Sequence, residues 1–234
     1  MRVDLEGFAA RTGADRGVLI VAPHPDDECA GPGGLAALCA QAGIEIGVVV
    51  VTGGGASHPN SRAWPRGRLA ARRQEETRAA LATLGVRAEP VFLGLPDAGT
   101  PSLPGTARAE ACARLRAEVE ARRPGLVVTT WRREPHCDHR FAYDLAVGAI
   151  ADTGSRLAEY LVWTDLIGAP GDAPASGEVE RLDLDISSVQ ARKADALRAH
   201  RSQLGLVVDD DPDGFVLSEA QLVALTGPVE TYLM

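Results

Sequence analysis

Two short segments hold most of the side chains in this 234-residue chain that could do chemistry together. The first reads Pro-His-Pro-Asp-Asp-Glu over residues 23–28, and the second reads His-Cys-Asp-His over residues 136–139. Three of the five histidines of the chain lie in these segments: His24, His136 and His139. A set of histidines and carboxylates that leaves one coordination position open suits a hydrolytic divalent metal, most often zinc. The residue types therefore indicate a hydrolytic metal site.

Each segment taken alone also has an ordinary structural explanation. Acidic residues at the start of a helix often serve as caps that interact favourably with the helix dipole. A single histidine after a strand is more often a satisfied loop residue than a ligand. Two such segments at the ends of two parallel strands favour a site, because ligands of open parallel sheets bind outside the carboxyl ends of the strands. We therefore expect both segments to face one crevice.

The elements that must position these segments follow from the hydrophobic pattern. The pattern predicts strands over residues 17–22, 44–52, 90–93, 125–131, 157–164 and 179–186. It predicts helices over residues 35–43, 68–85, 106–123, 138–152 and 187–204. Ser187 is the expected N-cap of the last helix. This alternation predicts an α/β fold, a three-layer α/β/α Rossmann-like arrangement with a mostly parallel central sheet.

The two candidate segments directly follow the predicted strands 17–22 and 125–131. Turn-forming residues predict loops over 53–67 and 95–105, each after a strand, and these loops are the expected walls of a site. No internal repeat or low-complexity tail interrupts the pattern. We therefore expect a single domain over residues 1–234.

Composition narrows the class of partner. The chain has 24 basic and 32 acidic residues, a net charge of −8, which argues against nucleic acid or an anionic membrane as the main partner. No run approaches the roughly 18 apolar residues of a membrane-spanning helix. Residues 1–7 carry acids instead of a secretory pattern, and the four cysteines form no C-x-x-C pair. These features predict a cytoplasmic protein with reduced thiols, and they do not indicate an oligomeric state.

Residues 23–28 resemble the A/P-H-P-D-D-E motif of the PIG-L/LmbE-like zinc deacetylases, and residues 136–139 resemble their second motif, H-x-D-H. Residues 73–86 are similar to the family's R-x-x-E helix followed by A-L-x-x-L-G-V, and residues 193–203 to its late K-x-x-A-L-x-x-H/Y-x-S-Q segment. The resemblance therefore covers most of the chain. It implies a zinc-dependent hydrolase that removes the acetyl group from a small N-acetylated sugar, an N-acetylglucosamine conjugate.

The resemblance also implies a role for each residue of the two motifs. It implies three metal ligands: His24, Asp27 and His139. The implied metal is Zn²⁺, with another divalent ion such as Fe²⁺ as the alternative. Asp26 would be the general base, and His136 would stabilise the oxyanion or protonate the leaving amine. Asp138 would orient and tune His136, a common role for a carboxylate beside an imidazole.

Four further residues are open to two interpretations each. Arg73 matches a family arginine associated with substrate binding, or it forms a surface ion pair with Glu76 one helical turn on. Asp97 matches an acidic position that meets the sugar, or it is a turn residue. His200 either reaches the site from the late helix or packs inside the protein. Cys137 stands where proline is frequent in the family, as a bystander or as a thiolate ligand.

Two alternative functions remain open from the sequence. One is an amidase that acts on a related sugar or thiol conjugate. The other is a nucleotide-binding Rossmann-type module without hydrolase activity, because Gly31-Pro32-Gly33-Gly34 follows a strand, although it lacks a complete G-x-G-x-x-G pattern. Within the hydrolase interpretation, loops 53–67 and 95–105 are expected to select the substrate.

Overall fold

A central sheet of eight strands dominates the computed structural model, which describes residues 1–234 apart from the side chain of Asp165. The strands are β1 (Arg2–Val3), β2 (Val18–Ala22), β3 (Ile46–Thr52), β4 (Val91–Leu95), β5 (Leu126–Thr130), β6 (Arg156–Tyr160), β7 (Arg181–Asp185) and β8 (Val229–Leu233). Their order in the sheet is β1-β7-β8-β6-β5-β2-β3-β4. Neighbouring strands are parallel except where β8 pairs antiparallel with β6 and β7.

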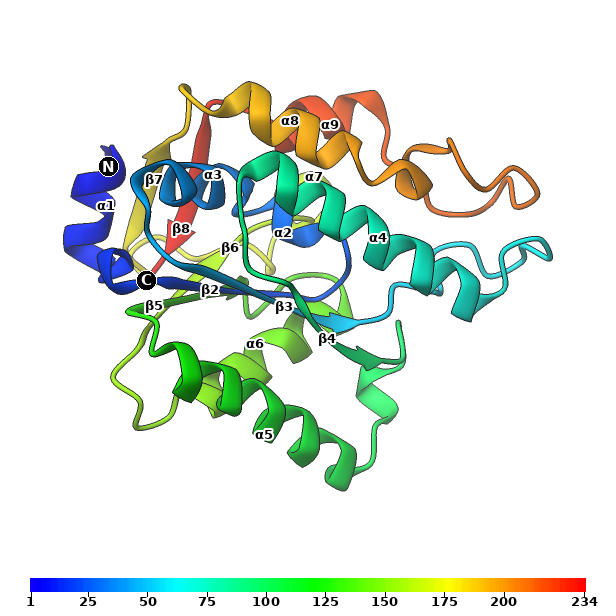
Figure 1. Cartoon of the computed structure of the whole chain (residues 1–234), viewed down its shortest axis with the longest axis horizontal. Coiled ribbons are helices and arrows are strands. Elements are labelled where there is room, and N and C mark those ends of the chain that lie inside the picture. Colours follow the sequence, from blue (N-terminus) through cyan, green and yellow to red (C-terminus); the bar gives the residue numbers. More distant parts are fainter.

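Helices cover both faces of the sheet, as Figure 1 shows. The helices are α1 (Leu5–Thr12), α2 (Asp27–Ala30), α3 (Gly33–Ala42), α4 (Arg66–Leu84), α5 (Gly105–Arg122), α6 (Cys137–Ile150), α7 (Thr164–Ile167), α8 (Gln190–Arg198) and α9 (Glu219–Leu225). Helices α5 and α6 lie against one face, and α3, α4 and α8 lie on the other (Figure 1). Within the described chain, we find no helix with the length and apolar character needed to cross a bilayer.

The apolar runs of the central strands are continuous because both faces are buried. In β2, Val18, Ile20 and Ala22 join the core beneath α3 and α4, whereas Leu19 and Val21 join the core beneath α5 and α6. A strand covered on both faces has no polar side, which removes the alternation seen in half-exposed strands. The predicted three-layer fold with a mostly parallel sheet is confirmed.

The order in which the chain adds strands to the sheet reverses between the parallel neighbours β2 and β5. From β2 the chain proceeds outward through β3 and β4, and from β5 it proceeds to the other side through β6. The two strands are direct neighbours, with Val21 paired to Thr129. The loops that leave their carboxyl ends diverge to opposite sides, and this divergence opens a crevice of the kind in which open α/β sheets bind ligands.

The late part of the chain differs from its prediction. The predicted helix 187–204 is shorter, because α8 starts after Val189 and a 3₁₀ turn over Arg201–Leu204 follows it. Ser187 is not the N-cap, since its hydroxyl donates to Asp185 (2.6 Å) and its backbone N–H binds the same oxygen. The predicted strand 157–164 ends at Tyr160, and β8 was not predicted.

The glycines over residues 31–34 serve packing between segments of the fold. A Cβ on Gly31 would lie 2.2 Å from the ring of Tyr160. The backbone N–H groups of Gly34 and Leu35, at the start of α3, donate to the Glu230 carboxylate (2.5 and 2.9 Å). Helix N-termini of this kind bind nucleotide phosphates in dinucleotide-binding folds. Here a carboxylate of the chain itself occupies that position, so the segment does not serve as a phosphate loop.

Candidate active site

The loop after β2 holds Asp26 in an unusual backbone conformation. Its φ angle is 136°, a region that residues with a side chain rarely adopt and that clusters at functional sites. The buried Glu28 carboxylate stabilises this conformation by accepting the Asp26 backbone N–H (2.8 Å), and its other oxygen lies 2.9 Å from His200 Nε2. Burial raises the pKa of Asp26 to about 6, although the Arg73 guanidinium opposes the rise.

Arg73 reaches this loop from α4. It is only 3% exposed, its guanidinium donates to the Gly54 carbonyl (2.8 Å), and it lies 3.1 Å from an Asp26 carboxylate oxygen. The alternative of a surface ion pair with Glu76 is wrong, because Glu76 pairs with Arg72 (3.0 Å). Arg73 therefore fixes the position of Asp26, and its contact with a substrate stays a prediction.

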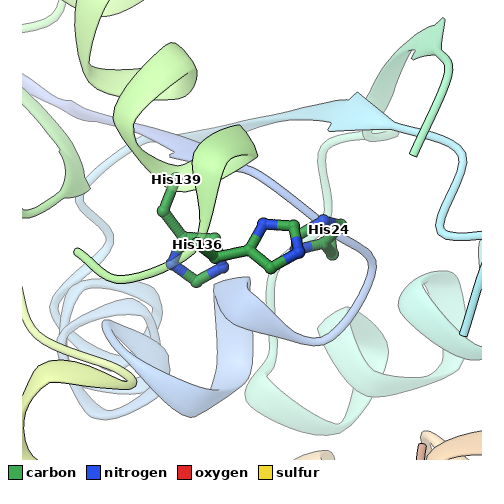
Figure 2. A group of neighbouring side chains, drawn as sticks. All are labelled: His24, His136 and His139. Atoms are coloured by element: carbon green, nitrogen blue, oxygen red, sulfur yellow. The ribbon is translucent and has the colours of Figure 1, made fainter. Parts of the chain in front are cut away.

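The loop after β5 and the start of α6 bring two more histidines to the same place. Figure 2 shows the rings of His24, His136 and His139 gathered together, with centroids 4.7 to 5.4 Å apart. His136 is the N-cap of α6, and its Nδ1 accepts the Asp138 backbone N–H (3.2 Å). Burial and the two other histidines lower the pKa of His136 to about 4. A neutral His136 that accepts at Nδ1 carries its proton on Nε2.

The Asp138 side chain lies beside a different histidine from the one predicted. Its buried carboxylate accepts hydrogen bonds from the Thr100 hydroxyl and the Ala98 backbone N–H (2.7 Å), and it lies 3.1 Å from His24 Nε2. These partners hold its pKa well below the usual range in spite of burial. Asp138 therefore orients His24 through its carboxylate and His136 through its backbone, which corrects the expectation that its carboxylate orients His136.

The predicted metal ligands converge on one carboxylate oxygen. Asp27 Oδ2 lies 3.2 Å from His24 Nδ1 and 3.3 Å from His139 Nε2. Burial raises the pKa of Asp27, but the two histidines outweigh it and hold the pKa well below its usual value. Both ring nitrogens of His139 are buried without a well-formed hydrogen bond among the described residues. Two imidazole nitrogens and one carboxylate oxygen with an unsatisfied donor atom fit a catalytic zinc site.

Glu134 supports this site, although its role was not predicted from the sequence. It is fully buried, and one of its oxygens lies 3.2 Å from His139 Nδ1. The carboxylate also accepts the backbone N–H groups of Val162, Trp163 and Thr164 at 2.9 to 3.1 Å. A carboxylate behind a ligating histidine fixes its tautomer and orientation. The only hint in the sequence is an acid two residues before the second motif.

Asp97 connects the two predicted loops at the site. Its Oδ1 lies 3.3 Å from His24 Nε2, and its Oδ2 accepts the Ala56 backbone N–H (2.8 Å). Burial raises its pKa, but the neighbouring His24 outweighs this and lowers the pKa overall. Asp97 therefore ties loop 53–67 to loop 95–105, and its contact with a sugar stays a prediction.

The remaining two open residues lie around the site. His200 is buried and contacts Glu28, so it supports the Asp26 loop from behind. The Cys137 thiol lies 3.6 Å from an Asp138 carboxylate oxygen, and burial raises the pKa of that thiol. Cys137, His136 and Asp138 lie close enough together to share a metal ion, so the interpretation of Cys137 as a ligand stays a prediction.

A cavity of about 580 Å³ lies in front of these residues. His24, Asp26, Asp27 and His136 line one part of it, and Trp163, Ile167 and Phe215 line another. Phe215 belongs to the late segment between α8 and α9, for which the sequence predicted no role in the site. That segment is fastened to loop 53–67, because the Phe215 backbone N–H donates to the Ser57 carbonyl (2.7 Å).

Comparison with known proteins places this site in a family. The family model described as PIG-L: GlcNAc-PI de-N-acetylase matches residues 19–150. A 1D-myo-inositol 2-acetamido-2-deoxy-alpha-D-glucopyranoside deacetylase from Mycobacteroides abscessus is 30% identical, over 90% of this chain and 88% of its own. A diacetylchitobiose deacetylase from Thermococcus kodakarensis is 32% identical, over 80% of this chain and 69% of its own. The solved N,N'-diacetylchitobiose deacetylase from Pyrococcus horikoshii aligns with a TM-score of 0.58 at 27% identity, covering 80% of this chain and 70% of its own.

Proposed function

The chain belongs to the PIG-L (GlcNAc-PI de-N-acetylase) family, and on that premise we propose that it is a metal-dependent N-deacetylase of an N-acetylglucosamine conjugate. The observation that carries the proposal is the meeting of the two motifs at the β2–β5 reversal. There a carboxylate held by an arginine, Asp26, lies next to a histidine and carboxylate donor set that fits a metal.

The donors His24, Asp27 and His139 would hold the metal, and Zn²⁺ suits two imidazole nitrogens and one carboxylate oxygen. When bound, such a metal supplies Lewis-acid polarisation of a carbonyl and lowers the pKa of a water molecule. The Asp138 carboxylate lies beside His24 Nε2, and the Glu134 carboxylate lies beside His139 Nδ1. Each carboxylate therefore keeps the ring of its histidine oriented.

Asp26 acts as the general base. Arg73 engages its Oδ2, which leaves Oδ1 to accept a proton from the attacking water. The water oxygen forms a bond to the acetamide carbon, the C–N bond then breaks, and the proton passes to the departing amine. The products are acetate and the free amino sugar.

His136 stabilises the charge that develops on the acetamide oxygen. Its Nδ1 accepts the Asp138 backbone N–H, so a neutral ring presents Nε2–H as a donor. A fixed donor aimed at the position of developing negative charge lowers the barrier of acyl transfer. His136 therefore serves as the oxyanion donor in this proposal.

The test combines a metal assay with a turnover assay. We expect the purified protein to contain about one zinc per chain, the number that a single three-ligand site binds, and to release acetate from N-acetylglucosaminides. Asp26→Asn should lower kcat by roughly 10²–10⁴-fold, the usual contribution of a general base, with the bound metal retained. Asp144→Asn, on the exposed surface of α6, is the matched control and should keep full activity. Full turnover in Asp26→Asn would exclude the assigned base, and absence of acetate from the metal-loaded protein would exclude the deacetylase.

A further inference from the structure

We propose that Trp163, Ile167 and Phe215, here called the apolar wall, form the binding site for an uncharged apolar aglycone of the sugar substrate. This inference rests on the proposed deacetylase function and adds a substrate class to it. The three side chains line the same cavity as His24 and Asp26. They come from two segments that are about 50 residues apart in the sequence and are brought together by the fold.

The apolar wall has the composition of a ligand surface. Trp163 and Phe215 pack edge to face, with ring centroids 5.5 Å apart and an interplanar angle of 88°. Ile167, at the end of α7, is 67% exposed, the most exposed of the large apolar side chains described. Apolar side chains that gather at the edge of a pocket are typical of ligand-binding surfaces.

The apolar wall is also fixed relative to the catalytic residues. The backbone N–H of Trp163 donates to Glu134 (2.9 Å), the same carboxylate that lies beside His139. The backbone N–H of Phe215 donates to Ser57, which lines the cavity from loop 53–67. A ligand group on the wall is therefore held at a constant position with respect to the reacting acetamide.

The charges around the cavity determine which aglycone fits. Four aspartates line it: Asp26, Asp27, Asp97 and Asp213. The one arginine among the lining residues, Arg73, already contacts Asp26 and two backbone carbonyls. A metal would offset the acidic charge at its own ligands but not at Asp213. A phosphate or carboxylate on the aglycone would thus meet repulsion and find no free guanidinium.

The occupant of the apolar wall is the aglycone because the other parts of the substrate do not match it. The acetyl group contributes a single methyl, which is too small to cover three large side chains. The pyranose ring presents hydroxyl groups around its edge, and its one C–H face is large enough for a single aromatic ring but not for all three side chains. An aryl or alkyl aglycone supplies the apolar area that is missing, and aromatic side chains pack well with aromatic ligand groups.

The test compares kcat/KM for three N-acetylglucosamine derivatives with the zinc-loaded protein: the phenyl glycoside, the methyl glycoside and the 1-phosphate. We expect the phenyl glycoside to exceed the methyl glycoside by about tenfold, the scale of one well-packed aromatic contact. The 1-phosphate should fall below the methyl glycoside. Phe215→Ala and Ile167→Ser should each reduce the phenyl-to-methyl ratio severalfold. Val223→Ser, an equally exposed position on α9 outside the cavity lining, should leave that ratio unchanged.

Each other outcome has a distinct meaning. Equal kcat/KM for the phenyl and methyl glycosides, or a preference for the 1-phosphate, overturns the aglycone site while acetate release upholds the deacetylase. A methyl glycoside with an N-octanoyl group that reacts faster than its N-acetyl counterpart also overturns it, because the wall would then take the acyl group. Absence of acetate from every compound overturns the proposed function itself.

Discussion

Replacing Glu134 with alanine is expected to weaken both the fold and the metal site, because one buried carboxylate holds parts of both. Three consecutive backbone N–H groups over residues 162–164 and the Thr164 hydroxyl donate to it, and His139 lies beside it. A hydrogen bond to a charged group contributes about 1.5–3 kcal/mol, and the four donors lose one shared acceptor. We expect the free energy of unfolding to fall by about 3–5 kcal/mol, since such contributions are not additive.

Urea unfolding of the metal-free protein measures this loss without the contribution of metal binding. The slope of the transition should stay constant while its midpoint falls. Competition with a chelator should show a metal affinity about 10–100-fold weaker, as for other carboxylates behind a ligating histidine. Glu120→Ala is the control, because its exposed ion pair with Arg116 contributes at most about 1 kcal/mol. A free-energy change for Glu134→Ala as small as that of Glu120→Ala would refute the assigned role of Glu134.

Three further variants test the packing of the fold by urea or thermal unfolding. Lys193→Met removes one partner of a buried ion pair with Glu230 (2.8 Å) and should cost about 3–5 kcal/mol of unfolding free energy; an unchanged midpoint would contradict this. Gly31→Ala should lower the unfolding temperature, because its Cβ would meet the Tyr160 ring. Gly67→Ala, in the first turn of α4 with open space around it, should instead stabilise the protein by roughly 0.4–1 kcal/mol, because alanine restricts the unfolded chain. Equal shifts in the two alanine variants would refute the packing argument.

The sequence predicts the central strands well because their signal is local. A continuous run without charged residues, such as residues 46–51, indicates a strand covered on both faces, and this inference does not require knowing its neighbours in the sheet. The adjacency of β2 and β5 depends on the order of the strands in the sheet. A hydrophobic pattern within one segment carries no information about that order. Strand β8 was missed for the same reason. It inserts antiparallel between β6 and β7, and its short sequence has no partner nearby in the chain.

The candidate site divides in the same way. The motif residues could be identified because each motif is contiguous and dense in metal-binding side chains. Their supporting contacts join distant segments: His200 reaches Glu28, and Glu134 reaches the turn over residues 162–164. Phe215 is positioned at the cavity by a hydrogen bond from its backbone N–H to the Ser57 carbonyl. Any residue except proline could form this bond, so the side chain gives no sign of it in the sequence. Such pairings become visible only when the chain is folded.

The burial of Lys193 has a consequence for how the protein can be handled and labelled. It is the only lysine in the 234 residues, and its amine lies inside the fold against Glu230 and the Gly31 carbonyl. Amine-directed reagents should therefore leave the Lys193 side chain unmodified as long as the chain is folded. The fraction of chains modified at Lys193 would then measure the fraction in which α3, α8 and β8 have separated.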